Sequence, residues 1–124
     1  METPQELEVW YIIPAIRREL ALSMKNNGMK QVEIADKLGV TKSAITQYIN
    51  HSRASQINFS VKIKAMINDS VNSINNKMDT MREIQKILVL ARNESLVCQV
   101  HRSMDKDFEN CNVCFEKRLV SIEK

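Results

Sequence analysis

The chain has 124 residues, of which 44% are hydrophobic and 27% are charged, with a formal net charge of +3. This length suits one compact domain or a small domain with an extension, and only two glycines and two prolines favour long helices over a many-turned β-fold. No run of about 18 apolar residues is present, which excludes a transmembrane span. The acidic start METPQELEVW is unlike a signal peptide. We therefore expect an all-α, cytoplasmic protein that has no membrane partner.

Charge is spread unevenly along the chain. Residues 1–16 carry three acidic residues and no basic one, residues 17–64 carry nine basic against three acidic residues, and residues 65–124 carry nine of each. The excess of positive charge in the second segment indicates a polyanionic partner for that segment.

The first predicted element is helical. Thr3 is followed by a proline and, three residues on, by a glutamate, which is the pattern of a capping-box helix start. Apolar residues then recur at spacings of three and four. Because Pro14 interrupts the pattern, it predicts either two helices, at about 4–12 and 14–26, or one kinked helix.

The run QVEIADKLGVTKSAITQYIN, residues 31–50, has the pattern of two helices joined by a tight turn. Ala35 supplies a small residue where the helices cross, and Gly39 supplies a turn residue that tolerates positive φ. Thr41 is expected to cap the second helix, about 42–50. The apolar residues predicted to point from this second helix into the core are Ile45, Tyr48 and Ile49.

This run resembles the helix-turn-helix of the lambda-repressor/Cro-like (XRE-type) regulators. The resemblance is carried by Gln31, Ile34, Ala35, Leu38, Gly39, Val40, Ile45 and Tyr48. The wider segment 9–55 is similar to a group of archaeal transcriptional regulators, in which such a unit is joined to a cysteine-containing C-terminal part. The resemblance implies that the second helix enters the major groove of double-stranded DNA.

The residues that the resemblance places on DNA fall into two groups. Outward side chains of the second helix would reach base edges, where the amides of Gln47 and Asn50 suit adenine. Gln31 and Arg53 would contact phosphates. Lys30 and His51 are further candidates for that role. The full predicted set is Gln31, Thr41, Lys42, Ser43, Thr46, Gln47, Asn50 and Arg53. The alternative is a helical hairpin whose polar residues are merely solvated.

From about Phe59 the sequence predicts a long helical region. Its apolar residues step by four and three, which indicates a heptad seam of about two repeats, and a fresh helix capped by Asp79 is expected to run on to residue 104. The seam is either an intramolecular core stripe or a dimer interface. A homodimer is favoured because regulators of this type read two half-sites. The seam residues are Ile67, Val71, Ile74, Met78 and Met81.

All three cysteines and one of the two histidines lie within CQVHRSMDKDFENCNVC, residues 98–114. Cys98 and His101 are three apart, as are Cys111 and Cys114, and two such pairs suit a tetrahedral Cys3His centre. Zinc is the favoured occupant, with an iron–sulfur cluster as the alternative. Other interpretations are a buried core thiol at Cys98, a surface histidine, and free or redox-active thiols.

These features divide the chain into a helix-turn-helix DNA-binding domain (1–58), a helical dimerisation or linker segment (59–97) and a Cys/His metal-binding tail (98–124). They predict a dimeric, sequence-specific transcriptional regulator whose metal centre is structural or senses redox or metal state. The alternative is a helical protein-interaction adaptor with a structural zinc. We expect no enzymatic activity and no small-molecule substrate, since no nucleophile–base constellation or phosphate loop is visible in the sequence.

Overall fold

The computed structural model describes residues 3–50 and 57–104, and the regular structure in these ranges is entirely helical, which confirms the predicted fold class. None of the helices in this part of the chain combines the length and the apolar character needed to cross a membrane. In chain order the elements are α1 (Pro4–Leu7), the π-helical turn η1 (Glu8–Ile12), α2 (Ile13–Asn26), α3 (Gln31–Leu38), α4 (Lys42–Asn50), α5 (Val61–Val71), α6 (Lys77–Asn93) and α7 (Leu96–Met104).

The N-terminal helix begins with the predicted capping box. The Thr3 hydroxyl accepts a hydrogen bond from the Glu6 N–H at 3.2 Å, and the Glu6 carboxylate accepts one from the Thr3 N–H at 3.1 Å. The two reciprocal bonds satisfy backbone donors that a helix start would otherwise leave unpaired. Hydrogen bonds from the Thr3 backbone N–H and, to a lesser extent, from the Thr3 hydroxyl hold the pKa of the Glu6 carboxylate below its ordinary value.

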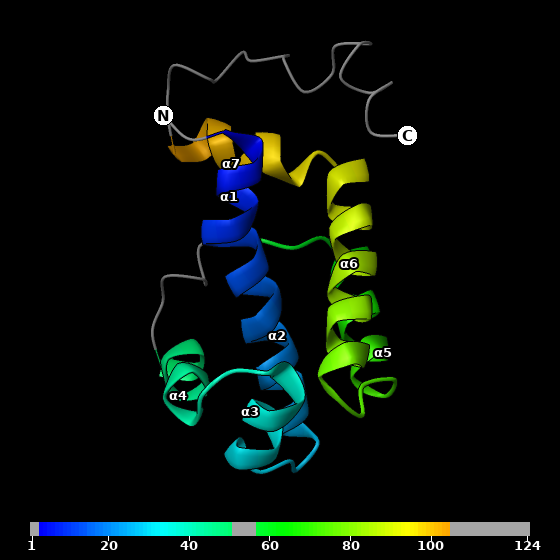
Figure 1. The fold of residues 1–124 in the computed structure, drawn as a ribbon. Coiled ribbons are helices and arrows are strands. Elements are labelled where there is room, and N and C mark those ends of the chain that lie inside the picture. Colours follow the sequence, from blue (N-terminus) through cyan, green and yellow to red (C-terminus); the bar gives the residue numbers. More distant parts are fainter. Residues whose placement is uncertain (1–2, 51–56, 105–124) are drawn as a thin grey trace.

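Pro14 does not divide this region into two helices. Instead, the Ile13 N–H donates to the Glu8 carbonyl, five residues back, so that the turn before the proline is π-helical. A proline ring clashes with the carbonyl four residues earlier in a regular α-helix, and the wider turn relieves that clash. The chain therefore runs as one continuous helix through α1, η1 and α2 (Figure 1). Gly28, at φ +88°, follows the end of α2.

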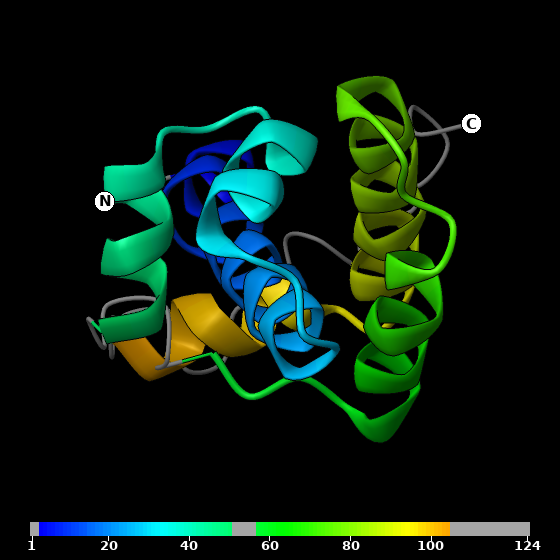
Figure 2. The same cartoon turned by 90° about the horizontal axis from the view of Figure 1, so that it is seen from below.

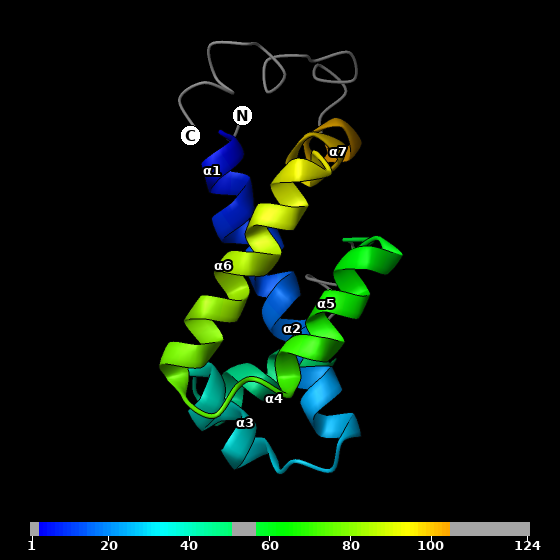
Figure 3. The ribbon, with the colours of Figure 1, turned by 90° about the vertical axis from the view of Figure 1, so that its right-hand side faces the viewer.

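Helix α2 is the centre of the fold. It contacts α3, α4, α5 and α6, while α7 packs against α1. Helices α4 and α6 lie on opposite sides of α2 (Figures 1 and 2), and α5 runs beside α6 (Figure 3). Buried side chains of these helices form a single hydrophobic cluster. Its largest fully buried members include Ile16, Leu20, Met24, Ile34, Ile45, Ile63, Ile67 and Ile87.

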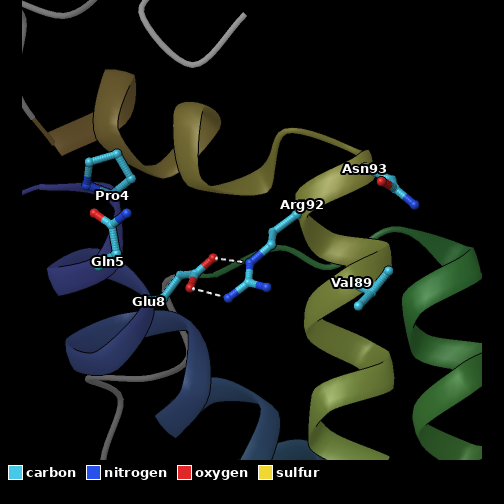
Figure 4. A pocket seen from close by; sticks show the side chains of 6 residues that line it. All are labelled: Pro4, Gln5, Glu8, Val89, Arg92 and Asn93. Carbon is cyan, nitrogen blue, oxygen red and sulfur yellow. Dashed lines mark hydrogen bonds and ion pairs between the residues drawn. The ribbon is translucent and has the colours of Figure 1, made fainter. Parts of the chain in front are cut away.

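A bidentate ion pair joins η1 to the end of α6. Arg92 of α6 donates from Nε and Nη2 to the two carboxylate oxygens of Glu8, each at 2.9 Å. The pair lies in a pocket of about 400 Å³ between α1 and α6 (Figure 4). The Glu8 side chain is only 11% exposed, so the guanidinium compensates a carboxylate that has lost most of its water.

The predicted heptad seam is wrong, because a turn at residues 72–76 separates α5 from α6. Ile67, Val71 and Ile74 are buried in the core, whereas Met78 and Met81 are 64% and 59% exposed. Ile74 lies within the turn and is buried, so the spacing of four and three in the sequence continues although the helix does not. The five residues thus form neither a continuous core stripe nor one continuous helical seam.

The predicted start and end of the next helix also need correction. Asn76, rather than Asp79, caps α6, since its Oδ1 accepts from the Asp79 N–H at 2.8 Å. The helix does not run on to residue 104, because Ser95 adopts φ +59° and separates α6 from α7. The inner face of α6 is apolar, and its residues Ile84, Leu88 and Ala91 are buried.

Candidate nucleic-acid interface

Helices α3 and α4 are joined by the tight turn that the sequence predicts. Gly39 ends α3 in the left-handed conformation, at φ +70°, which costs a residue without a side chain little. The Val40 N–H then donates to the Ala35 carbonyl at 3.0 Å. Thr41 caps α4 as expected, because its hydroxyl accepts from the Ala44 N–H at 3.0 Å.

One face of α4 is anchored in the core. Ile45 is fully buried, and Tyr48 and Ile49 are partly buried against the same cluster, as predicted. The contacts of α4 are made with α2 and α3. Since Ile45 is the one buried residue of this nine-residue helix, it sets the rotation of α4 about its own axis.

The opposite face of α4, which we call the α4 outer face, is exposed to solvent. It consists of Lys42, Ser43, Thr46, Gln47 and Asn50, which are all exposed and are all residues predicted to contact DNA. The spacings between them place them on one side of a helix. The Thr46 hydroxyl donates to the Lys42 carbonyl at 3.2 Å, and its oxygen keeps a lone pair for an incoming donor.

The other predicted DNA contacts lie at the edges of this face or outside the described residues. Gln31 is the first residue of α3 and is partly exposed, and Thr41 is exposed at the start of α4. Lys30, just before α3, is also exposed. Arg53 and His51 lie outside the described part of the chain. The roles of all of these residues on DNA stay predictions.

A contact that the sequence did not predict supports the helix-turn-helix from behind. The Thr80 hydroxyl of α6 donates to the Lys37 carbonyl of α3 at 2.6 Å. Next to it, the Lys77 side chain lies 3.4 Å from the point that a Cβ on Gly39 would occupy. The bonded residues are 43 positions apart, so periodicity and capping patterns give no signal for this contact. It fixes the end of α3 on the first turn of α6.

We expect Thr80→Val to lower the free energy of unfolding by about 1–3 kcal/mol, because it leaves the Lys37 carbonyl without its buried donor. Thr80 is only 3% exposed, so water has little access to replace the bond. Thr46→Val is the matched control. It removes a hydroxyl that also donates to a helix carbonyl, but on the exposed side of α4. Urea unfolding of both variants tests this, and equal losses of stability would contradict the role assigned to Thr80.

The two predicted metal ligands nearer the N-terminus both lie in α7. Cys98 is buried at 7% exposure, and His101 follows it by one helical turn, so that the two positions share a face of the helix. The side chain of His101, and Cys111 and Cys114 entirely, lie outside the described residues. Within the described part of the chain no three potential metal-binding side chains gather together. The Cys3His centre itself stays a prediction.

A comparison with protein families agrees with the arrangement of α3 and α4. The family model described as helix-turn-helix matches residues 20–63, a stretch that extends from the second half of α2 to the start of α5. No curated protein and no solved structure gives a significant match to the chain. Residues 20–63 are therefore similar to a helix-turn-helix family, and α3 and α4 are the two crossing helices of that unit.

Proposed function

We propose that this protein is a sequence-specific transcriptional regulator that binds double-stranded DNA through the α4 outer face. The observation that carries the proposal is the two-sided character of α4, which is anchored by Ile45 on one side and exposed to solvent on the other. Such a helix enters the major groove with its outer side chains toward the bases. In this arrangement Gln47 and Asn50 read base edges, while Lys42 and Gln31 contact phosphates.

We further propose that the regulator acts as a homodimer, because one copy of α4 covers too few base pairs for useful specificity. A two-fold axis between the copies would have to keep both α4 outer faces directed toward one DNA duplex, about one helical turn apart.

We also propose that Cys98, His101, Cys111 and Cys114 hold a zinc ion, with an iron–sulfur cluster as the alternative occupant. A zinc ion would tie α7 to the residues that follow it, while a cluster would give the regulator a redox input. In either case loss of the centre would alter the C-terminal part and with it the spacing of the two α4 helices.

The DNA proposal is tested by selecting binding sites for the full chain from a random pool of duplexes. We expect enrichment of a two-fold symmetric sequence whose half-sites are about one helical turn, roughly 10 base pairs, apart. Affinity for the enriched site should fall steeply as salt rises, since phosphate contacts release counterions. A pool that remains unenriched would contradict the proposal and favour the protein-interaction adaptor.

The metal proposal predicts that protein purified without oxygen carries one zinc per chain and no visible absorption. Iron, sulfide and a band near roughly 400 nm would instead assign the iron–sulfur alternative. The variant Cys111→Ser/Cys114→Ser should lose the metal in either case, and Gln99→Ser in the exposed part of α7 is the control that should keep it. Wild-type protein without metal would overturn the assignment. Equal binding of one selected duplex by metal-loaded and metal-free protein would leave the centre a purely structural role.

A further inference from the structure

The outer side of α6 carries apolar side chains that no part of the described chain covers. Met78, Met81 and Val89 are 64%, 59% and 54% exposed. Together with the exposed side chains between them they form a surface that we call the α6 ridge, made of Met78, Met81, Arg82, Gln85, Lys86 and Val89. These positions follow the three- and four-residue spacing of a helix-packing seam, and a shallow, mainly apolar groove runs along them.

Folding does not explain why this side of α6 is apolar. The helix already buries a complete inner stripe in the core, which includes Ile84, Ile87 and Leu88. The ridge is therefore a second apolar stripe on the same helix, opposite to the first. Contiguous exposed apolar side chains with a polar rim are typical of protein-binding surfaces, and methionine suits such a surface because its side chain adapts to its partner.

The two charged side chains within the α6 ridge are basic, while exposed Asp36 and Lys77 border its Met78 end. The Arg82 and Lys86 side chains are 61% and 60% exposed. Their partners within the helix, Asp79 and Glu83, are only 20% and 9% exposed, so the acids lie beneath and the bases face outward. A binding partner would thus meet methionines flanked by positive charge.

A second copy of this chain does not match that surface. A two-fold pairing of α6 with α6 would bring the exposed bases of both copies together, and like charges placed opposite each other disfavour association. It would also carry the two α4 helices to the outer ends of the dimer, turned away from each other, because α4 and α6 lie on opposite sides of α2 (Figures 1 and 2). DNA does not match it either, since the groove along the ridge is mainly apolar.

We propose that the α6 ridge is a docking site for an acidic amphipathic helix of another protein. The apolar side of that helix packs on Met78, Met81 and Val89, while its carboxylates face Arg82 and Lys86. The site does not rest on DNA binding, because it lies away from the α4 outer face. A regulator with this arrangement holds DNA on one side of α2 and presents the ridge to a protein on the other.

Two synthetic helical peptides test the proposal with the full-length protein. Both have leucines at the spacing of one helical stripe, and the flanking positions are glutamate in one peptide and lysine in the other. Fluorescence anisotropy should show binding of the glutamate peptide at least about tenfold tighter than binding of the lysine peptide. In NMR spectra the glutamate peptide should shift backbone resonances of α6 and leave those of α4 unchanged.

Two matched pairs of variants locate the site. Met78→Gln/Met81→Gln should weaken the glutamate peptide at least about tenfold, whereas Val61→Thr, which alters an 84% exposed side chain on α5, should not. Arg82→Gln/Lys86→Gln should remove most of the preference for the glutamate peptide, and Lys62→Gln/Lys64→Gln on α5 should preserve it. Melting curves of every variant establish that it is folded.

The alternative occupants give different outcomes. If Met78→Gln/Met81→Gln converts a dimer into a monomer in sedimentation, the ridge is a contact between copies. If Arg82→Gln/Lys86→Gln weakens binding to duplex DNA, the ridge belongs to the DNA interface. Either result, or failure of the wild-type protein to bind the glutamate peptide, would overturn the proposal. None of these outcomes depends on whether a specific DNA sequence is found.

Discussion

Replacing Gln47 by alanine is expected to abolish discrimination at one base pair of the selected DNA site. Gln47 is exposed near the middle of the α4 outer face, and a bidentate amide–adenine contact contributes about 1–3 kcal/mol of discrimination against the wrong base. This corresponds to roughly 5- to 150-fold in Kd. Asn50→Ala should have an effect of the same size at a neighbouring position. The measurement is the Kd for the selected duplex and for duplexes with each single base changed.

The matched control for this experiment is Gln85→Ala, which removes the same amide from an exposed position on α6. Because α6 lies on the far side of α2, base preference should not change (Figure 2). Lys42→Ala separates the two kinds of contact, since a lost phosphate contact weakens all duplexes alike and reduces the salt dependence. If Gln47→Ala keeps the base preferences of the wild type, Gln47 does not read a base.

Ile45→Ala is expected to produce one of the largest losses of stability in the protein. Ile45 is the fully buried residue of α4, and truncating such a side chain costs about 2–5 kcal/mol. For a chain of this size we expect a fall in Tm on the order of 10 °C. Affinity for the selected duplex should fall as well, even well below the Tm, because α4 loses the side chain that sets its orientation.

Two controls make this result specific. Ile45→Val keeps most of the side chain and should cost about 0.5–1.5 kcal/mol. Val32→Ala shortens an aliphatic side chain that is 62% exposed on α3, and it should stay within about 0.5 kcal/mol of the wild type. Thermal melts and binding curves should therefore rank the three variants in the same order. Full affinity in a folded Ile45→Ala protein would show that the anchor does not orient α4.

The parts of the structure that the sequence predicted depend on interactions within a few residues. The caps at Thr3 and Thr41 and the left-handed Gly39 each have a short local pattern, and each is confirmed. The burial of Ile45 follows from periodicity within one helix, and once it is known, the exposed residues of α4 follow too. These signals were sufficient for the all-α class and for the helix-turn-helix.

The features that sequence reasoning missed depend on contacts between distant residues. The Glu8–Arg92 pair spans 84 positions and the Thr80–Lys37 bond spans 43, and neither leaves a periodic pattern. Periodicity also misled where it continued by coincidence, since Ile74 kept the heptad spacing from within a turn. Met78 is exposed because another side of α6 packs on the core. The sequence of α6 alone does not determine which side this is, since it depends on how the helices pack.

The π-helical turn at Glu8–Ile12 has a consequence for how sequences of this kind diverge. A π-helical turn holds one residue more than an α-helical turn, and here the extra residue is useful because Pro14 follows it. In a descendant that loses the proline, the extra residue has no remaining function, and its deletion would restore a regular helix. We therefore expect the two changes to be inherited together: a chain of common ancestry that lacks this proline should also be one residue shorter between Leu7 and Ile13.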